Sequence, residues 1–261
     1  MSSHDTRPGD APWPGYEGVP HRSTRMRPRR RAIARNLEAS AAVPTLTADM
    51  QVDLTNTDRV RAGWPDDLGA RPSLMAILCH DAARALREHP DLNASLDGDN
   101  VVHWDTVNLG VAVDTPGGLV VPVIRDAQDQ SAGELTQKIV ALADRARSGM
   151  LELTDLQAGT FTVSNPGSVG PSLRAEAFLN LPQVAILGLP GVRRVPLAVD
   201  TNEGEQVEIR RVINLSLSFD HRALDGGEAI RFLMTVRDRL EGAGPESYAA
   251  AATEIEDGDS A

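Results

Sequence analysis

One stretch of alternating side chains restricts the possible folds of this chain more than any other feature. Over residues 212–219, VINLSLSF, apolar residues alternate with small polar ones. Successive side chains of a β-strand point to opposite faces, so the pattern predicts a strand with one face against a core. The apolar face holds Ile213, Leu215, Leu217 and Phe219, and the polar face holds Asn214, Ser216 and Ser218. The chain therefore contains a sheet with one buried, apolar face.

Further strands and helices can be placed around this one. Strand patterns occur in residues 46–53, 101–104, 108–113, 119–124, 159–165 and 183–189. Helical spacing predicts helices at 30–40, 73–88, 131–147 and 228–242, the last with Ile230 facing inward. Residues 89–99 are expected to be a loop, and Gly226 and Gly227 to break the chain. Because strands and helices interleave without a strict βαβ repeat, we expect an α/β fold, a two-layer sandwich with a mixed β-sheet.

The length and composition favour one large domain with tails. The chain has 261 residues and is 41% hydrophobic, enough for a substantial core. Residues 1–24 are predicted to be a flexible N-terminal arm, 25–243 the folded domain, and 244–261 an acidic disordered tail. No apolar run reaches the roughly 18 residues that a membrane helix needs, and the N-terminus has no signal-like segment. We therefore expect a cytoplasmic protein without membrane contact.

Charge and cysteine content exclude several function classes. The net charge of −11 argues against a nucleic-acid partner. The single cysteine, Cys79, lies in the apolar run LMAILC and is interpreted as a buried core thiol rather than a nucleophile. The histidines other than His221 show no ligand spacing, so no metal site is expected.

The candidate chemistry lies where the alternating strand ends. Asp220, His221 and Arg222 follow it directly, and Asp225 and Gly226 begin a glycine-containing turn. A histidine at a strand end is exposed to a cleft yet firmly supported, as a general base must be. By composition alone an ordinary surface histidine is the alternative. The sequence has no G-x-S-x-G elbow, phosphate-binding loop or HExxH motif, which removes the common hydrolases, nucleotide triphosphatases and zinc peptidases.

The segment DHRALDGGEAIRFL resembles the C-terminal signature of the E2 acyltransferase core of 2-oxo acid dehydrogenases, whose fold is shared with chloramphenicol acetyltransferase. Five further blocks match in the same order over residues 25–241: RRAIARNLEAS, LREHPDLNASLDGD, NLGVAVDTPGGLVVPVIRDA, LADRARSGMLELTDLQAGTFTVSNPGSVG and LPQVAILGL. The resemblance implies a chloramphenicol acetyltransferase-like, trimeric fold, and it makes residues 25–243 an acyltransferase catalytic domain.

The same resemblance assigns roles to individual residues. His221 would take the proton from an attacking thiol or hydroxyl, and Ser164 would donate a hydrogen bond to the oxyanion formed from acyl-CoA. Asp225 would pair with an arginine near the N-terminus, Arg30 as first choice and Arg35 as second. Gly226 would support the turn, where Asp225 could equally be a plain turn former. Arg193 and Arg194 are weak candidates for the CoA phosphates, with ordinary surface exposure as the alternative.

The resemblance also implies a homotrimer in which the histidine of one subunit faces the serine of its neighbour. The chain departs from the family pattern in having His80 where the family has a lysine, and Thr45 where a histidine often follows the first strand's proline. Its last residues, GPESYAAAATEIEDGDSA, replace a leucine-rich anchor. We therefore expect a trimer in solution rather than a 24-mer or 60-mer.

The sequence leaves three functions open. Lys138 is the only lysine and falls within a predicted helix, so no lipoyl attachment is expected. The first function is a free-standing enzyme moving an acetyl or short acyl group from acyl-CoA, its cosubstrate, to a hydroxyl of a small or carrier-bound acceptor, similar to the E2-type acetyltransferases of tetronate polyketide pathways. The second is an E2 core subunit acting on a dihydrolipoyl group supplied in trans. The third is a non-catalytic scaffold in a dehydrogenase complex.

Overall fold

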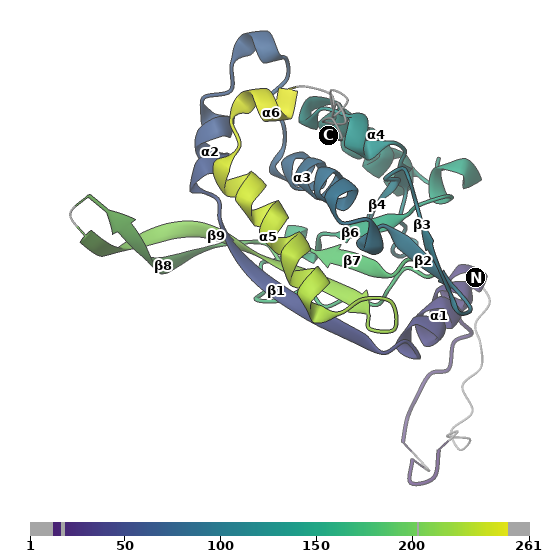
Figure 1. Ribbon diagram of the computed structural model, residues 1–261. Coiled ribbons are helices and arrows are strands. Elements are labelled where there is room, and N and C mark those ends of the chain that lie inside the picture. The colour runs from purple at the N-terminus through teal and green to yellow at the C-terminus, as the bar shows by residue number, and fades with distance from the viewer. Residues whose placement is uncertain (1–12, 17–18, 203, 250–261) are drawn as a thin grey trace.

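The computed structural model describes residues 13–16, 19–202 and 204–249, and a mixed sheet forms its centre (Figure 1). The sheet has the strand order β1-β9-β7-β6-β4-β5, with β8 paired to the outer part of β9. Its strands are β1 (Thr45–Asp53), β4 (Leu109–Val111), β5 (Val123–Ile124), β6 (Phe161–Ser164), β7 (Ala185–Gly188), β8 (Val192–Thr201) and β9 (Gly204–Asp220). Only the β4–β6 and β6–β7 pairs are parallel. The expected mixed sheet is confirmed.

Helices cover one face of this sheet (Figure 1). They are α2 (Thr55–Ala62), α3 (Leu74–Glu88), α4 (Ala132–Ser148), α5 (Gly226–Gly242) and α6 (Pro245–Ala249), and α3 and α5 pack on the strands. Helix α1 (Pro28–Ala41) does not belong to this layer. The alternation in β9 determines which face the other helices take: Leu215, Leu217 and Phe219 are buried beneath them. The predicted apolar face is confirmed.

Local signals explain where the long helices begin. The Ser73 hydroxyl accepts from the backbone N–H of Ala76 and caps α3. At α4, Ser131 accepts from the backbone N–H of Glu134, and the Glu134 carboxylate accepts from the backbone N–H of Ser131, a capping box. The hydrogen bonds from Ser131 also hold the pKa of Glu134 below its usual range.

Three local predictions were wrong. The expected loop at 89–99 contains strand β2 (Ala94–Asp97), which pairs with β3 (Asn100–His103) in a separate small sheet. Gly226 and Gly227 do not break the chain but form the first turn of α5, because Asp225 caps that helix. Ile230 is exposed rather than inward, since the inner face of α5 is formed by Ala229, Leu233 and Val236.

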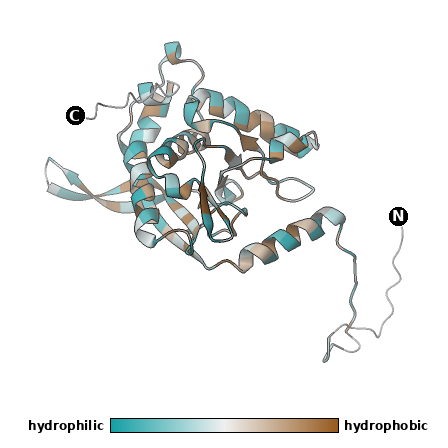
Figure 2. Ribbon diagram, turned by 45° about the vertical axis from the view of Figure 1, so that its right-hand side comes forward, coloured by the Kyte–Doolittle hydropathy of each residue, from teal (hydrophilic) through white to brown (hydrophobic). Residues whose placement is uncertain are grey.

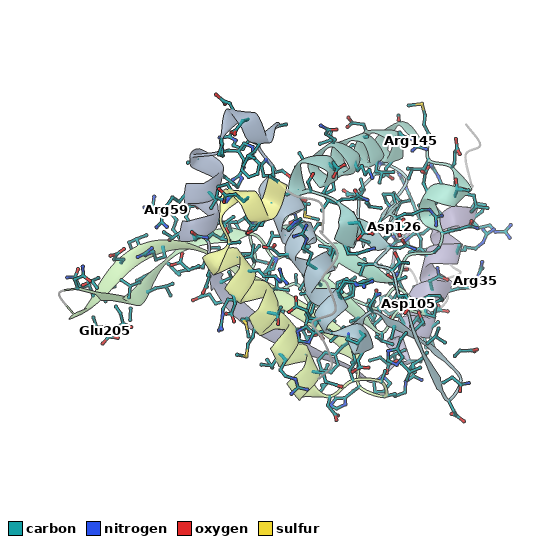
Figure 3. The ribbon with its side chains drawn as sticks, turned by 45° about the horizontal axis from the view of Figure 1, so that its top comes forward. Arg35, Arg59, Asp105, Asp126, Arg145 and Glu205 are labelled. Atoms are coloured by element: carbon teal, nitrogen blue, oxygen red, sulfur yellow. The ribbon has the colours of Figure 1, made fainter. Side chains whose placement is uncertain are left out.

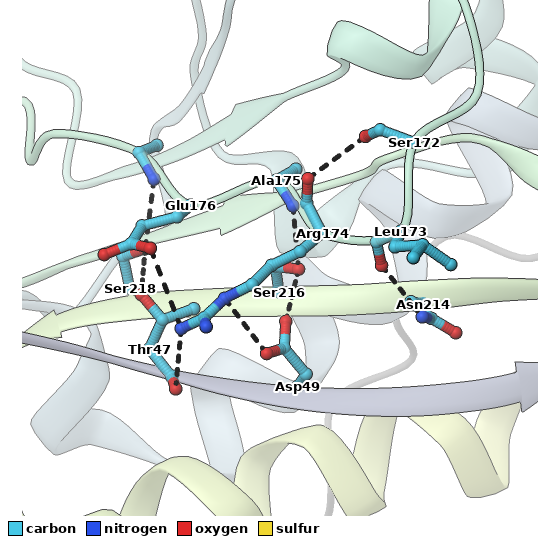
Figure 4. Close-up of polar contacts among 11 residues, drawn as sticks. Thr47, Asp49, Ser172, Leu173, Arg174, Ala175, Glu176, Asn214, Ser216 and Ser218 are labelled. Carbon is cyan, nitrogen blue, oxygen red and sulfur yellow. Dashed lines mark hydrogen bonds and ion pairs between the residues drawn. The ribbon is translucent and has the colours of Figure 1, made fainter.

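The other face of the sheet is crossed by a segment without regular structure. After β6 the chain passes a short helical turn (Pro166–Ser168) and runs over β9 and β1 before it returns to β7 (Figure 4). We call residues 172–178 the strap. Ser216 and Ser218 face this side and are fully buried, whereas Asn214 is only partly buried, so the strap covers the polar face of β9 towards its end at Asp220.

The C-terminal end of the folded domain differs from expectation. The predicted tail begins too early, because residues 245–249 form α6 and Tyr248 is fully buried, with its hydroxyl donating to Asp81 Oδ2 at 3.1 Å. Residues 250–261 and much of the predicted arm, 1–12 and 17–18, lie outside the described residues. Helix α1 lies at the margin of the molecule (Figure 2). Within the described part of the chain, no helix is both long and apolar enough to cross a membrane.

Candidate active site

Ser164 is the last residue of β6 and opens onto a pocket of about 390 Å³. The strand alternation places it on the strap side of the sheet, and its hydroxyl has no hydrogen-bond partner among the described residues, so it is available to a ligand. The pocket walls come from α1, the β4–β5 region, β6, β7 and the end of the strap: Ile33, Asn36, Leu37, Ala39, Ala112, Leu119, Val121, Thr162, Ala177, Phe178, Leu179, Asn180, Leu181 and Ile186. None of these side chains is charged.

A buried polar network lies beside Ser164 in the same pocket. The Thr162 hydroxyl donates to Gln183 Oε1 at 2.6 Å and accepts from Asn180 Nδ2 at 3.3 Å. Thr162 shares the strand face of Ser164, so the alternation of residues 159–165 already placed it there. Asn180 and Gln183 were missed as site residues, because Asn180 lies in the irregular return to β7 and the predicted strand over 183–189 gave Gln183 no functional role.

His221 follows directly after β9 and is held at two points. Its backbone N–H donates to the carbonyl of Pro44 at 2.9 Å, and its ring centroid lies 5.8 Å from that of Phe219. The neighbouring Asp220 is buried, and its carboxylate receives Nε and Nη2 of Arg222 at 2.9 and 2.6 Å. This fork fixes the turn, while the imidazole remains 38% exposed and accessible.

Asp225 lies in the neighbourhood of His221 but is nearly free in solvent. Its Oδ1 is 3.9 Å from His221 Nδ1, its side chain is 89% exposed, and its backbone N–H donates to Glu228 Oε2 at 2.7 Å. The predicted pairing with Arg30 or Arg35 is not formed in the described part of the protomer. Both arginines are exposed on α1, and Arg35 lies at the outer edge of the molecule (Figure 3). At Gly226 a side chain would meet open space, so packing does not demand glycine there.

Ser164 and His221 are far apart within one protomer. Ser164 is in register with Gly188, and Gly188 with Ser216. His221 is five residues beyond Ser216 along the chain. Two strand spacings and five residues of strand separate their Cα atoms by about 20 Å. The two side chains also belong to opposite sides of the sheet, because His221 contacts Phe219 and Ser164 faces the strap. One protomer therefore cannot bring both groups to the same reacting atom.

The remaining candidates lie away from this pocket. Arg193 and Arg194 are on β8 at the base of the β8–β9 hairpin, which projects from the body (Figure 1). Lys138 is exposed in the middle of α4. Burial raises the pKa of Cys79 to about 12, so this thiol is inert, as predicted. Among the residues that the structure describes, no three His, Cys, Asp or Glu side chains gather into a possible metal site.

A comparison with models of known protein families identifies the family of this chain. The model for "2-oxoacid dehydrogenases acyltransferase (catalytic domain)" matches residues 19–248. The chain belongs to this acyltransferase family. The resemblance seen in six blocks of sequence is thereby confirmed, and the chain is an acyltransferase-family catalytic domain with a mixed sheet.

Two relatives in this family are named for different acyl groups, succinyl and acetyl. The dihydrolipoyllysine-residue succinyltransferase component of the 2-oxoglutarate dehydrogenase complex of Haemophilus influenzae is 37% identical over 217 residues, 82% of this chain and 52% of that protein. The corresponding acetyltransferase component of the pyruvate dehydrogenase complex of Corynebacterium glutamicum is 37% identical over 213 residues, 79% of this chain and 31% of that protein. The chain thus spans about half the length of the first relative and about a third of the second.

A solved relative bears directly on the candidate residues. The dihydrolipoamide acetyltransferase of Azotobacter vinelandii has a TM-score of 0.80 and 30% identity, covering 90% of this chain and 98% of that one. In that protein the roles of one serine, one histidine and one asparagine in the catalytic mechanism have been investigated, and the last two are four residues apart. His221 and Asp225 have the same spacing, with aspartate in place of the asparagine.

Proposed function

We propose that this domain transfers a short acyl group between CoA and a thiol of a dihydrolipoyl group carried by another domain or polypeptide. The observation that supports the proposal is the uncharged pocket that ends at the free hydroxyl of Ser164. The relatives named for dihydrolipoyllysine indicate the acceptor. The hydroxyl acceptor and the tetronate-type pathway expected first from the sequence receive no support from them. The lipoyl alternative therefore becomes the leading proposal.

The proposed chemistry uses the two candidate residues in turn. His221 accepts the proton of the attacking thiol, and the resulting thiolate adds to the thioester carbonyl. The tetrahedral oxyanion accepts a hydrogen bond from Ser164, and its collapse expels the second thiolate, which recovers the proton from His221. A thiolate is a much weaker base than an alkoxide. A neutral imidazole therefore removes the proton of a thiol more readily than that of a hydroxyl. Asp225 caps α5 and supports the turn of His221.

The pocket favours an uncharged acyl group such as acetyl. No charged side chain lines it on this protomer, and a succinyl carboxylate placed there would lose water without gaining a countercharge. This proposal departs from the succinyltransferase relatives and agrees with the acetyltransferase ones. It predicts a higher kcat/KM for acetyl-CoA than for succinyl-CoA.

The function can be tested with small acceptors. The purified chain is incubated with acetyl-CoA and dihydrolipoamide, and acylated product is followed by mass spectrometry. The matched control acceptor carries hydroxyls in place of both thiols. We expect acylation of the dithiol and at least about tenfold less of the diol, because His221 must remove the acceptor proton. Acylation of the diol alone would favour the hypothesis of a hydroxyl acceptor. No transfer to either acceptor would favour a non-catalytic scaffold.

A further inference from the structure

The strap is attached to the sheet by a regular series of side chains. Alternate residues of β9 each bind its backbone at successive points, a spacing that matches an extended segment laid over a strand (Figure 4). The Asn214 amide donates to the carbonyl of Leu173 at 2.9 Å, and the hydroxyls of Ser216 and Ser218 accept from the N–H groups of Ala175 and Ala177 at 3.1 and 3.2 Å. The polar face of β9 is thus a binding track for the strap.

Asp49 on β1 completes this attachment from below. Its Oδ1 accepts from the Ser216 hydroxyl at 2.6 Å, and its Oδ2 lies 3.2 Å from Nε of Arg174 in the strap. A serine hydroxyl has one hydrogen, and donating it to the carboxylate turns the oxygen lone pair toward the Ala175 N–H. Asp49 therefore holds the strap twice, through its arginine and through the serine that binds its backbone.

The attachment lies in the same row of the sheet as Ser164. Ser164, Gly188, Ser216 and Asp49 are neighbours across four strands. At Gly188 a Cβ would come within 2.2 Å of the Ala175 carbonyl oxygen, so the strap rests directly on the backbone beside Ser164. The next residues, Ala177 and Phe178, form part of the wall of the Ser164 pocket.

We propose that Asp49 is a positioning residue that sets the width of the Ser164 pocket by holding the strap. The proposal rests on the proposed function, since it takes the pocket as the acyl site. Asp49 touches no reacting atom; it acts through Arg174 and Ser216 on the wall formed by Ala177 and Phe178. Loosening the strap then weakens binding of the acyl donor in ground state and transition state alike, which raises KM and leaves kcat nearly unchanged.

The test uses Asp49→Asn, which keeps an acceptor for Ser216 but removes the charge that faces Arg174. The matched control is Asp144→Asn on α4, another carboxylate paired with an arginine, Arg147, at 3.5 Å but far from the strap. For Asp49→Asn we expect KM for acetyl-CoA to rise about tenfold with kcat within about threefold of wild type. Hydrogen exchange of the peptide containing Ala175 and Ala177 should speed up about tenfold, with α3 and α5 unchanged. The control should change none of these.

A second variant tests whether the effect runs through the strap. Arg174→Gln removes the other partner of the ion pair together with the contact of Arg174 to the Thr47 carbonyl. The double variant should raise KM no further than the stronger single variant, because the charge removed in Asp49→Asn acts on the strap through Arg174. Additive effects, an unchanged KM or unchanged strap exchange in Asp49→Asn would overturn the proposal. If the wild type transfers no acyl group, the proposed function fails, while the exchange rates still decide whether Asp49 holds the strap.

Discussion

Residues 215–219 of β9 are buried on both faces of the strand, but by different means. Leu217 on one face packs beneath helices, and Ser218 on the other accepts a hydrogen bond from the strap. Burying a leucine side chain contributes about 1.5–3 kcal/mol to stability, whereas a net intramolecular hydrogen bond contributes about 0.5–1.5 kcal/mol. Hydrogen bonds, however, specify direction and register. We therefore expect the helix face mainly to stabilise the fold and, as proposed for Asp49, the strap face to position the pocket.

The largest expected effect tests the separation of His221 and Ser164 on opposite sides of the sheet. His221→Ala should lower kcat by about a thousandfold and Ser164→Ala by about a hundredfold, with melting temperatures unchanged, because both groups act in the transition state. In an equal mixture of the two variants, refolded together as random trimers, about a quarter of all sites would combine an intact histidine with an intact serine. We therefore expect about a quarter of wild-type activity to return.

The assembly of the mixture is measured by light scattering, which should give three times the 27.9 kDa chain mass. Activity that stays at the level of the single variants would contradict a shared site. A wild-type monomer with full activity would do so as well, since the two residues lie about 20 Å apart within one chain.

The next effect concerns the helix face. Leu217→Ala removes a fully buried side chain between the sheet and its helices and should lower the free energy of unfolding by about 3 kcal/mol. Because Leu217 faces the helices and does not line the pocket, kcat and KM of the folded fraction should stay within about twofold of wild type. Urea unfolding followed by circular dichroism measures the first quantity. A large change in KM would show that the two faces are not separable.

The smallest effect comes from the opposite face, one residue further along. Ser218→Ala leaves the Ala177 N–H without its acceptor and breaks the 2.9 Å contact with the Thr47 hydroxyl, at a cost of about 1–2 kcal/mol. Here KM for acetyl-CoA should rise severalfold although stability falls less than in Leu217→Ala. Parallel unfolding and kinetic measurements on both variants give the contrast. If the rise in KM relative to the loss of unfolding free energy were the same in both variants, the two faces would not differ in function.

Much of this architecture was readable from the sequence because it repeats. The alternation of residues 212–219 identified both faces of β9, and helical spacing predicted α3 and α4 over residues 73–88 and 131–147, within one residue of their observed ends. His221 and Ser164 were identifiable because they stand at strand ends within motifs that resemble a known family. Their roles remain predictions. The pairing expected between Asp225 and Arg30 or Arg35 is not formed within the described protomer, since a sequence resemblance transfers residue types more reliably than pairings between distant elements.

The sequence by itself determined the class of fold, the family and the residues that are candidates for chemistry, since each depends on local periodicity or on ordered motifs. Only the tertiary structure decided that the strap covers the polar face, that Asp49 reaches Arg174 and Ser216, and that Tyr248 is buried at the predicted tail. The strap meets residues of β9 that lie 41 positions further along the chain, and the contacts of Asp49 and Tyr248 join segments more than 100 residues apart. The strap itself has no periodic pattern. Long-range contacts of this kind follow from how the layers pack, and the spacing of residues along one segment carries no record of them.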